Sequence, residues 1–367
     1  MESAPLFDRL LARLTASPRF RRWAFRTPGV ASVARARGRA AFDLCAGFAY
    51  SQVLLACSRL RLFEALRAGP AATGDLAVRL DLPVAATERL LRAAASLALV
   101  AAHGDRWRLA SLGASLLDAP GERAMIEHGA VAYPDLADPV ALLRGEASPG
   151  ALARFWTYAG GGRAPDAAQA AAYGAPMAAS QAFIAQDVLD AVDLRRARRL
   201  LDIGGGEGAF LCAAAARHSH LHVILLDLPE VAARARIRFA DAGLGGRADA
   251  VGADLRDEIA PPAADAVSLV RVLHDHDDAE ALAILRVARA ALPPGGLLVV
   301  AEPMSGVRGA ERVADAYFGF YLLAMGSGRA RTLAEHRDLM LAAGFDRVRR
   351  LRTARPFLTS VLVARAA

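Results

Sequence analysis

Residues 199–209 read RLLDIGGGEGA, a short apolar strand that runs directly into a glycine-rich turn and the start of a helix. Glycine at Gly204, Gly205, Gly206 and Gly208 lets the backbone approach a ligand closely, and the free amide groups at a helix N-terminus can bind polar ligand atoms. The same stretch also satisfies the G-x-G-x-x-A fingerprint of nicotinamide-binding folds. The turn therefore predicts a nucleotide-like ligand without deciding which one.

The sequence around this turn alternates strand and helix patterns. Short Val/Ile/Leu runs typical of strands occur at RLLDIG, HVILLD, ADAVSLV and GLLVVAEP, with helical stretches between them. Continuous apolar strands that alternate with helices indicate a parallel sheet covered on both faces. The stretches DRVRRLRT and FLTSVLVARA are expected to close the chain as a hairpin that adds one antiparallel strand. The predicted fold class is α/β, a Rossmann-like doubly wound sheet over residues 196–367.

Residues 41–120 show a different pattern, three helices followed by a hairpin with its turn at Gly104. This is a winged helix, an architecture that often binds DNA through its third helix. The third helix, expected at about 85–99, carries few basic residues, Arg89 and Arg92, and suits a protein interface better than phosphate contact. We expect a dimerisation domain and a homodimer, and no nucleic-acid partner.

Residues 1–40 are expected to form a basic amphipathic arm. From Leu6 to Phe25, apolar residues recur at helical spacing with arginines between them. The arm holds nine arginines against Glu2 and Asp8, which matches the net charge of +7 of the whole chain. Such a helix can lie on an anionic membrane surface or pack on a partner subunit.

Length and composition set further limits. The 367 residues suggest two domains, and 54% hydrophobic with 23% charged residues excludes a disordered chain. No apolar run approaches the roughly 18 residues of a spanning helix, and the N-terminus lacks the layout of a signal peptide. We expect a cytoplasmic location, with peripheral contact to the inner membrane through the arm. Residues 121–195 are expected to be a helical linker that contributes to a substrate pocket.

Five motifs settle the nature of the ligand. The strings LDIGGGEG, LLDLPEV, GADLRDEI, RVLHDHDD and LPPGGLLVVAEPM occur in this order. With the winged helix included, nearly the whole chain resembles the S-adenosylmethionine-dependent O-methyltransferases of the plant caffeic-acid type and their bacterial relatives. The resemblance implies S-adenosylmethionine as cofactor, S-adenosylhomocysteine as its product, and no metal. The closing antiparallel hairpin agrees, being typical of methyltransferase sheets.

The resemblance also implies the roles of individual residues around the cofactor. The turn Gly204, Gly205 and Gly206 packs against the methionine moiety, and Asp227 binds the ribose. Asp254 and Leu255 flank the adenine, and Arg271 lies near the cofactor. Leu228 is a further cofactor-binding residue.

Methyl transfer from a sulfonium is an in-line displacement that needs an aligned nucleophile and a base for the hydroxyl proton. The resemblance places the base at His274, with Glu302 as the carboxylate that orients it and Asp275 as a polar neighbour. Two departures stand out: His276 occupies the place of a usual Trp, and Ala330 that of the second acidic orienting residue of plant members. The predicted catalytic set is thus reduced to His274 and Glu302.

The substrate is indicated by the stretches YFGFYLLAMGSGRARTLAEHRDLMLAAGF and MAASQAFIAQDVLDAVDL. They are most similar to the bacterial carotenoid O-methyltransferases, which methylate the tertiary 1-hydroxyl of acyclic carotenoids such as demethylspheroidene and hydroxyneurosporene. A substrate of that kind resides in membrane, which gives the basic arm a docking role. The apolar wall of the pocket is predicted to include Met177, Phe183, Phe320, Tyr321 and Met325.

Other interpretations of the acceptor, of the winged helix and of one histidine run remain open from the sequence. The acceptor could be a phenolic or polyketide hydroxyl, or a ring carbon of a bacteriochlorophyll precursor. The winged helix could belong to a DNA-binding regulator that senses S-adenosylmethionine, although His274 and Glu302 argue against it. The spacing His218-x-His220-x-His222 is only weakly suggestive of a metal-ligand set.

Overall fold

The computed structural model describes residues 12–156, 181–257 and 259–367. By its internal contacts the chain divides into two compact units, Met1–Leu117 and Asp118–Ala367, and each is described by itself. The predicted boundary at residue 120 lies close to this division. The predicted linker, residues 121–195, belongs to the same unit as the large sheet.

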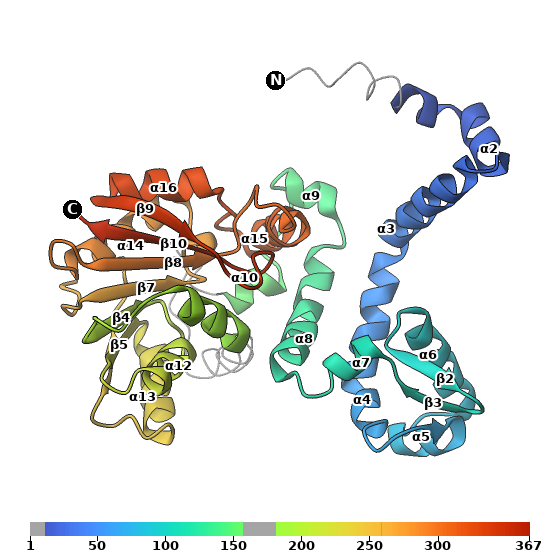
Figure 1. Cartoon of the computed structure of the whole chain (residues 1–367), viewed down its shortest axis with the longest axis horizontal. Helices are drawn as coiled ribbons and strands as arrows, with labels where there is room; N and C mark the ends of the chain where they lie inside the picture. Colours follow the sequence, from blue (N-terminus) through green and yellow to red (C-terminus); the bar gives the residue numbers. More distant parts are fainter. Residues whose placement is uncertain (1–11, 157–180, 258) are drawn as a thin grey trace. The chain divides into compact units, whose positions relative to one another are not determined.

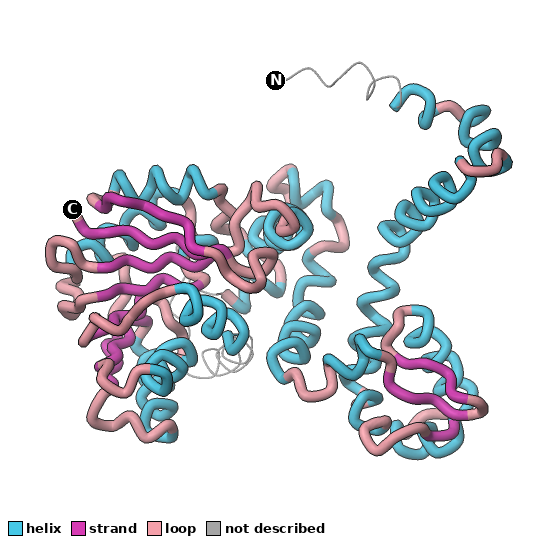
Figure 2. Tube along the Cα trace, viewed as in Figure 1, coloured by secondary structure: helices cyan, strands magenta, loops and turns pink. Residues whose placement is uncertain are grey.

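The first unit contains the predicted helices and hairpin (Figure 2). Its three-stranded antiparallel sheet has the order β1-β3-β2, and Gly104 makes the hairpin turn with a positive φ of 63°. Leu62, Phe63, Leu76 and Leu91 form the centre of its core. The elements are α4 (Leu62–Ala65), β1 (Ala71–Ala72), α5 (Thr73–Leu80), α6 (Val84–Ser96), β2 (Val100–His103), β3 (Arg106–Leu109) and α7 (Ser111–Ser115).

The N-terminal arm differs from the single helix predicted over Leu6–Phe25. Within the described residues the helical path breaks at Ser17, and helix α2 runs over Pro18–Arg26. Ser17 caps α2 by accepting a hydrogen bond from the Phe20 amide, and Pro18 occupies the first turn, where it has no N–H to lose. Over the described residues 12–26 the chain is helical as the apolar spacing predicts, except that the Ser-Pro pair starts a second helix.

Helix α3 (Val30–Arg59) runs through the predicted boundary at residue 40. By length and composition it is apolar enough to cross a membrane, which corrects the expectation that no segment meets that test. Counting uninterrupted apolar runs missed it because small and polar residues are interspersed along the helix. Phe42, Leu44 and Phe48 are 66%, 80% and 76% exposed within the chain. These exposed apolar side chains also suit a helix that packs against another protein surface.

The second unit is built on a seven-stranded sheet of order β6-β5-β4-β7-β8-β10-β9. The pairings among the first five strands are parallel, and β10 is antiparallel to both β8 and β9, as the closing hairpin predicted. Figure 1 shows β7, β8, β10 and β9 side by side. The strands are β4 (Arg199–Ile203), β5 (His222–Asp227), β6 (Ala248–Gly252), β7 (Ala266–Val270), β8 (Leu297–Glu302), β9 (Phe345–Leu351) and β10 (Ser360–Ala366).

Helices cover both faces of this sheet. Alternate strand residues point to opposite faces, and the apolar side chains on each face are buried against helices. Leu201 and Ile203 of β4 join one buried cluster with α14 (Asp278–Ala290) and α16 (Leu333–Ala342). Leu200 joins the opposite cluster with α12 (Ala209–Arg217), α13 (Pro229–Asp241) and the helical residues 181–191. The predicted α/β fold is confirmed.

A smaller helical cluster completes this unit. Its buried centre includes Leu152, Trp156, Tyr321 and Leu322. The helical segments of this part of the unit are α8 (Pro120–Asp135), α9 (Pro139–Leu143), α10 (Ala151–Phe155), the π-helical turn η3 (Arg312–Phe318) and α15 (Gly319–Met325). The described part of the predicted linker therefore contributes core residues to the second unit.

Candidate active site

A cavity opens at the carboxyl ends of strands β4, β5, β6 and β7, where ligands of open α/β sheets bind. It is lined by residues that follow these strands, and by the helical residues Tyr317, Phe318 and Tyr321. Predicted cofactor residues from the four strand ends all line it: Gly204, Gly205, Gly206, Asp227, Leu228, Asp254, Leu255 and Arg271. Four segments far apart in sequence thus converge on one space.

The glycine-rich turn follows β4 and lies over a buried carboxyl group. A Cβ at Gly205 would lie only 2.1 Å from Oδ2 of Asp202, so no side chain fits there. Asp202 is fully buried; its Oδ1 accepts a hydrogen bond of 2.6 Å from the Ser268 hydroxyl, while Oδ2 has no partner within the described structure. Burial raises the pKa of Asp202 to about 7. The turn is therefore a tight cradle with an unsatisfied acceptor beneath it.

Asp227 ends β5 and is tied to the same turn. Its Oδ2 accepts the backbone N–H of Gly206 at 2.8 Å, and its Oδ1 accepts that of Leu228 at 2.7 Å. Burial raises the pKa of Asp227 to about 6, although both backbone hydrogen bonds favour the charged form. The carboxylate is held rigidly at the edge of the cavity.

Asp254 and Arg271 occupy two further strand ends. Asp254 binds Arg256 at 2.6 Å, and this hydrogen bond holds the pKa of Asp254 below its ordinary value. Arg271 adopts a positive φ of 58°, and its guanidinium carbon lies 5.6 Å from the centre of the Phe318 ring. Glu207, which sequence reasoning did not single out, also lines the cavity.

His274 and Glu302 form a buried pair at neighbouring strand ends. Glu302 is the last residue of β8, and His274 lies in the short 3-10 turn η2 (Leu273–Asp275) after β7, which pairs with β8 in parallel. Nδ1 of His274 lies 2.6 Å from Oε2 of Glu302. Oε1 of Glu302 accepts the backbone N–H groups of Val272 at 2.9 Å and Leu273 at 2.7 Å. One carboxylate therefore holds both the ring and its backbone.

Asp275 lies on the other side of the imidazole. Its Oδ1 is 3.2 Å from Nε2 of His274, and His274 itself is 3% exposed. Burial alone would lower the pKa of His274, but the negative charges of Asp275 and Glu302 outweigh it and hold this pKa above its ordinary value. Because Glu302 takes Nδ1–H, Nε2 is the nitrogen that can accept a proton. Asp275 lines the cavity with His274, and Glu302 stands behind the imidazole.

The predicted substrate residues are placed differently from one another. Tyr321 lines the cavity, whereas Phe320 is 37% exposed and Met325 is buried in the helical cluster, neither bordering the cavity. Phe183, also 37% exposed, stacks with the Arg355 guanidinium at 4.7 Å instead of bordering the cavity. Met177 lies outside the described residues. Of the predicted apolar wall, Tyr321 therefore borders the cavity, and Phe183, Phe320 and Met325 do not.

Sequence reasoning missed the groups around Tyr321. The Tyr321 hydroxyl accepts a hydrogen bond of 2.5 Å from Nε1 of Trp156 and lies 2.6 Å from Nε2 of His128, and all three residues line the cavity. Burial, with a smaller contribution from the Arg271 charge, lowers the pKa of His128 to about 4. A neutral His128 can therefore accept a hydrogen bond from the Tyr321 hydroxyl. No motif marks His128, which is a single histidine within α8.

The structure also places Ala330 and His276, the two departures from the plant pattern, and His222 of the histidine run. Ala330 packs against the helical cluster, and His276 lines the cavity with its Nδ1 3.2 Å from Oε2 of Glu280. Nε2 of His222 lies 2.7 Å from Oδ2 of Asp249. Within the part of the chain that the structure describes, no group of three or more His, Cys, Asp or Glu side chains could hold a metal ion.

Comparison with known proteins identifies the class of protein. A profile of the O-methyltransferase domain matches residues 133–346, and a profile of the O-methyltransferase dimerisation domain matches residues 42–119. The solved structure of LaPhzM has a TM-score of 0.75 and 27% identity, covering 90% of this chain and 99% of its own. The chain belongs to the O-methyltransferase family.

Two curated relatives extend over nearly the whole length. Demethylspheroidene O-methyltransferase of Cereibacter sphaeroides is 42% identical over 97% of this chain and 94% of its own. The protein of the same name from Rhodobacter capsulatus is 42% identical over 96% of this chain and 88% of its own. The protein is therefore an enzyme of methyl transfer that carries the dimerisation domain of its family, which supports a homodimer.

Proposed function

We propose that this enzyme transfers the methyl group of S-adenosylmethionine to the tertiary 1-hydroxyl of an acyclic carotenoid such as demethylspheroidene or hydroxyneurosporene. The observation that carries the proposal is the 42% identity, over nearly the full length, to two proteins named demethylspheroidene O-methyltransferase. The buried histidine and carboxylate pair at the cavity supplies the chemistry that an alcohol acceptor needs.

The strand ends fit the methyl donor. S-adenosylmethionine, when bound, supplies an electrophilic methyl group on a sulfonium. The cradle at Gly204, Gly205 and Gly206 lines the cavity and lets a ligand approach the backbone closely. Asp227 would bind the ribose hydroxyls, as a rigid carboxylate at the end of the second strand does in nucleotide sites. Asp254, Leu255 and Arg271 complete this side of the cavity, the first two beside the adenine.

His274 is the general base of the proposed reaction. Glu302 fixes the Nδ1–H tautomer, so Nε2 takes the proton of the acceptor hydroxyl as the oxygen attacks. The imidazolium that forms lies between two carboxylates, Glu302 and Asp275, which stabilise its charge. General base catalysis of this kind contributes roughly 10²- to 10⁴-fold to a rate.

The acceptor is tested with methyl-labelled S-adenosylmethionine and two acceptors, a detergent-dispersed 1-hydroxylated acyclic carotenoid and a simple phenol. The proposal expects label in a carotenoid methyl ether. Label in the phenol alone would show that the acceptor is phenolic. Label on a tetrapyrrole ring carbon in a further assay would show that the acceptor is a bacteriochlorophyll precursor.

A membrane-resident acceptor also gives the arm a function, and we propose that it docks the cytoplasmic enzyme on the inner membrane without spanning it. Helix α2 presents Arg19, Arg21 and Arg22, all exposed, beside Trp23 and Phe25, which are 51% and 46% exposed. Arginines attract anionic headgroups, and aromatic side chains insert at the boundary of the acyl region.

Docking is tested by cosedimentation with phosphatidylglycerol vesicles. Deletion of residues 1–40 would cut helix α3, so the variant R19Q/R21Q/R22Q is the better probe. The matched control R308Q/R312Q/R337Q removes the same charge from exposed positions of the second unit. Weaker binding of the arm variant alone supports docking, and equal binding of both variants and wild type contradicts it.

A further inference from the structure

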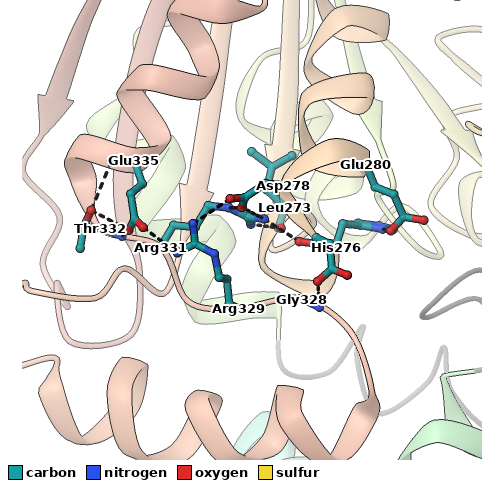
Figure 3. A network of polar contacts seen from close by, with 10 residues as sticks. Leu273, His276, Asp278, Glu280, Gly328, Arg329, Arg331, Thr332 and Glu335 are labelled. Carbon is teal, nitrogen blue, oxygen red and sulfur yellow. Dashed lines mark hydrogen bonds and ion pairs between the residues drawn. The ribbon is translucent and has the colours of Figure 1, made fainter.

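The guanidinium of Arg331 is completely buried beside the turn that carries His274. We infer that Arg331 is a positioning residue that fixes the backbone of this turn and thereby holds the imidazole in place. This rests on the proposed role of His274 as general base. Arg331 lies in the segment Ser327–Thr332, between α15 and α16, and Figure 3 shows its side chain reaching the turn from that segment.

Arg331 holds the turn at both ends. Its Nη1 donates to the carbonyl oxygen of Leu273 at 2.6 Å, and its Nη2 donates to that of His276 at 2.7 Å. Leu273 directly precedes His274, and His276 directly follows Asp275. Two donors on one rigid plane therefore set the distance between the backbone groups on either side of His274 and Asp275 (Figure 3).

A third contact fixes the guanidinium itself. Its Nε donates to Oδ1 of Asp278 at 2.9 Å, and Asp278 is the first residue of α14. A buried charge is costly unless it is paired and hydrogen-bonded, so leaving this arrangement would expose an uncompensated cation to the core. The carboxylate anchors Arg331 to a helix of the sheet layer.

The remainder of the segment braces the same turn. The Ser327 hydroxyl donates to the carbonyl oxygen of Asp275 at 2.8 Å, and the Gly328 amide donates to Oδ1 of Asp277 at 3.0 Å. A Cβ at Gly328 would lie 2.1 Å from the carbonyl oxygen of His274, so the two backbones are in direct contact. Thr332 then begins α16 with a capping box that fixes the end of the segment.

Glu302 and Arg331 act on opposite polar groups of the same turn. Glu302 accepts the backbone N–H groups of Val272 and Leu273, whereas Arg331 donates to the carbonyl groups of Leu273 and His276. Ala330 stands where plant members have a second carboxylate for the imidazole. In this chain the segment therefore positions His274 through its backbone and not through its ring.

The test compares R331K with R329K. Arg329 also contacts Asp278, at 3.0 Å, but its side chain is 44% exposed, and it donates to the carboxylates of Asp278 and Glu335 rather than to the turn. Lysine keeps the charge in both variants, and at position 331 it lacks the planar fork that spans two carbonyls and a carboxylate. We expect R331K to lower kcat at least about tenfold, because small misplacements of a catalytic group are costly. R329K should stay within about twofold of wild type.

Two readouts separate positioning from general damage. The KM for the methyl donor should stay within about twofold in R331K, since the proposed donor contacts, except Arg271, lie at strand ends other than that of β7. The pKa of His274, followed by NMR titration of labelled histidine without any acceptor, should fall in R331K, because the imidazole moves away from Asp275 and Glu302. This second readout remains valid even if the carotenoid is not the acceptor.

Equal kcat and equal His274 pKa in R331K and R329K would overturn the inference. A loss of kcat with an unchanged His274 pKa would also overturn it. If R331K does not fold cooperatively, D278A decides, because it removes the carboxylate that fixes the guanidinium of Arg331 and thereby loosens both carbonyl contacts. The control is R329Q, which removes the contact between Asp278 and the exposed Arg329. A kcat about threefold or more below that of R329Q supports positioning, and an equal kcat contradicts it.

Discussion

Nδ1 of His274 lies 2.6 Å from Oε2 of Glu302, and both side chains are buried at the ends of adjacent parallel strands. Glu302 ends β8, and its other oxygen is already saturated by two backbone N–H groups of the turn after β7. The carboxylate therefore cannot rotate without losing three contacts. This relationship fixes the tautomer of the proposed base and sets its proton affinity.

The pH dependence of kcat follows from that pair. His274 must be neutral to accept a proton, and Asp275 and Glu302 hold its pKa above the ordinary value of about 6.5 despite burial, so activity should rise with pH through a midpoint above about 6.5. In E302Q one stabilising anion is lost, so the midpoint should move to lower pH while the plateau falls at least about tenfold.

The control for this pH profile is E280Q, which removes a carboxylate near His276 in the same cavity. It should leave the midpoint in place. An E302Q profile with the wild-type midpoint would contradict the assignment of Glu302 as the partner that raises the pKa of His274.

Affinity for the methyl donor should depend on the charge of Asp227. Burial raises its pKa to about 6, and ribose hydroxyls donate more strongly to the ionised carboxylate, so the Kd should rise as the pH falls below about 6. D227N should weaken binding about tenfold or more at pH 7, as expected when a hydrogen bond to a charged group is lost. Calorimetric titration with S-adenosylhomocysteine at pH 5 and 7 measures both effects, and persistence of the pH dependence in D227N would refute the role.

The glycine-rich turn should tolerate no side chain at Gly205. A Cβ there would lie 2.1 Å from Asp202 Oδ2 and 2.8 Å from Leu225 Cδ1, both in the packed core, so G205A should lower the free energy of unfolding by about 1–3 kcal/mol and weaken donor binding. At Gly319, in α15, an added Cβ would meet nothing within 4 Å, so G319A should be neutral or slightly stabilising. Urea unfolding of both variants checks this, and equal stability would show that the turn relaxes.

Tyr321 should contribute to stability through its hydroxyl. Y321F removes the hydrogen bonds to Trp156 and His128 inside the cavity wall, with an expected loss of about 1–3 kcal/mol in the free energy of unfolding. Y317F removes a hydroxyl from the ring stacked on Tyr321, in a residue that is 40% exposed, and should change stability by less than about 0.5 kcal/mol. Indistinguishable unfolding curves for the two variants would show that the buried hydroxyl contributes nothing.

The strands of the sheet were predictable where burial on both faces made the sequence continuously apolar. RLLDIG, HVILLD, ADAVSLV and GLLVVAEP all form strands. Strand β6 (Ala248–Gly252) was missed because it is an edge strand whose residues are mostly half-buried or exposed, so ADAVG carries no apolar run. The residues that the sequence assigns to the cofactor all line the cavity for a related reason, since each lies within a contiguous motif at a strand end.

The pocket wall was not predictable in the same way, because it depends on which face of a helix turns inward. Phe318 and Tyr321 are three residues apart and both line the cavity, whereas Phe320, between them, is exposed. His128 and Trp156 come from distant segments, α8 and the end of α10, and only tertiary packing brings them to Tyr321. The same holds for Arg331, whose burial no local pattern announces.

The most direct test of the account is single-turnover methyl transfer to a 1-hydroxylated acyclic carotenoid by wild-type enzyme and H274A, with binding of S-adenosylhomocysteine measured in parallel. We predict label in the carotenoid methyl ether for wild type, a rate at least about 10²-fold lower in H274A, and unchanged binding. Turnover that survives in H274A at the wild-type rate would contradict a base at His274 and point to an acceptor whose reaction needs no hydroxyl deprotonation.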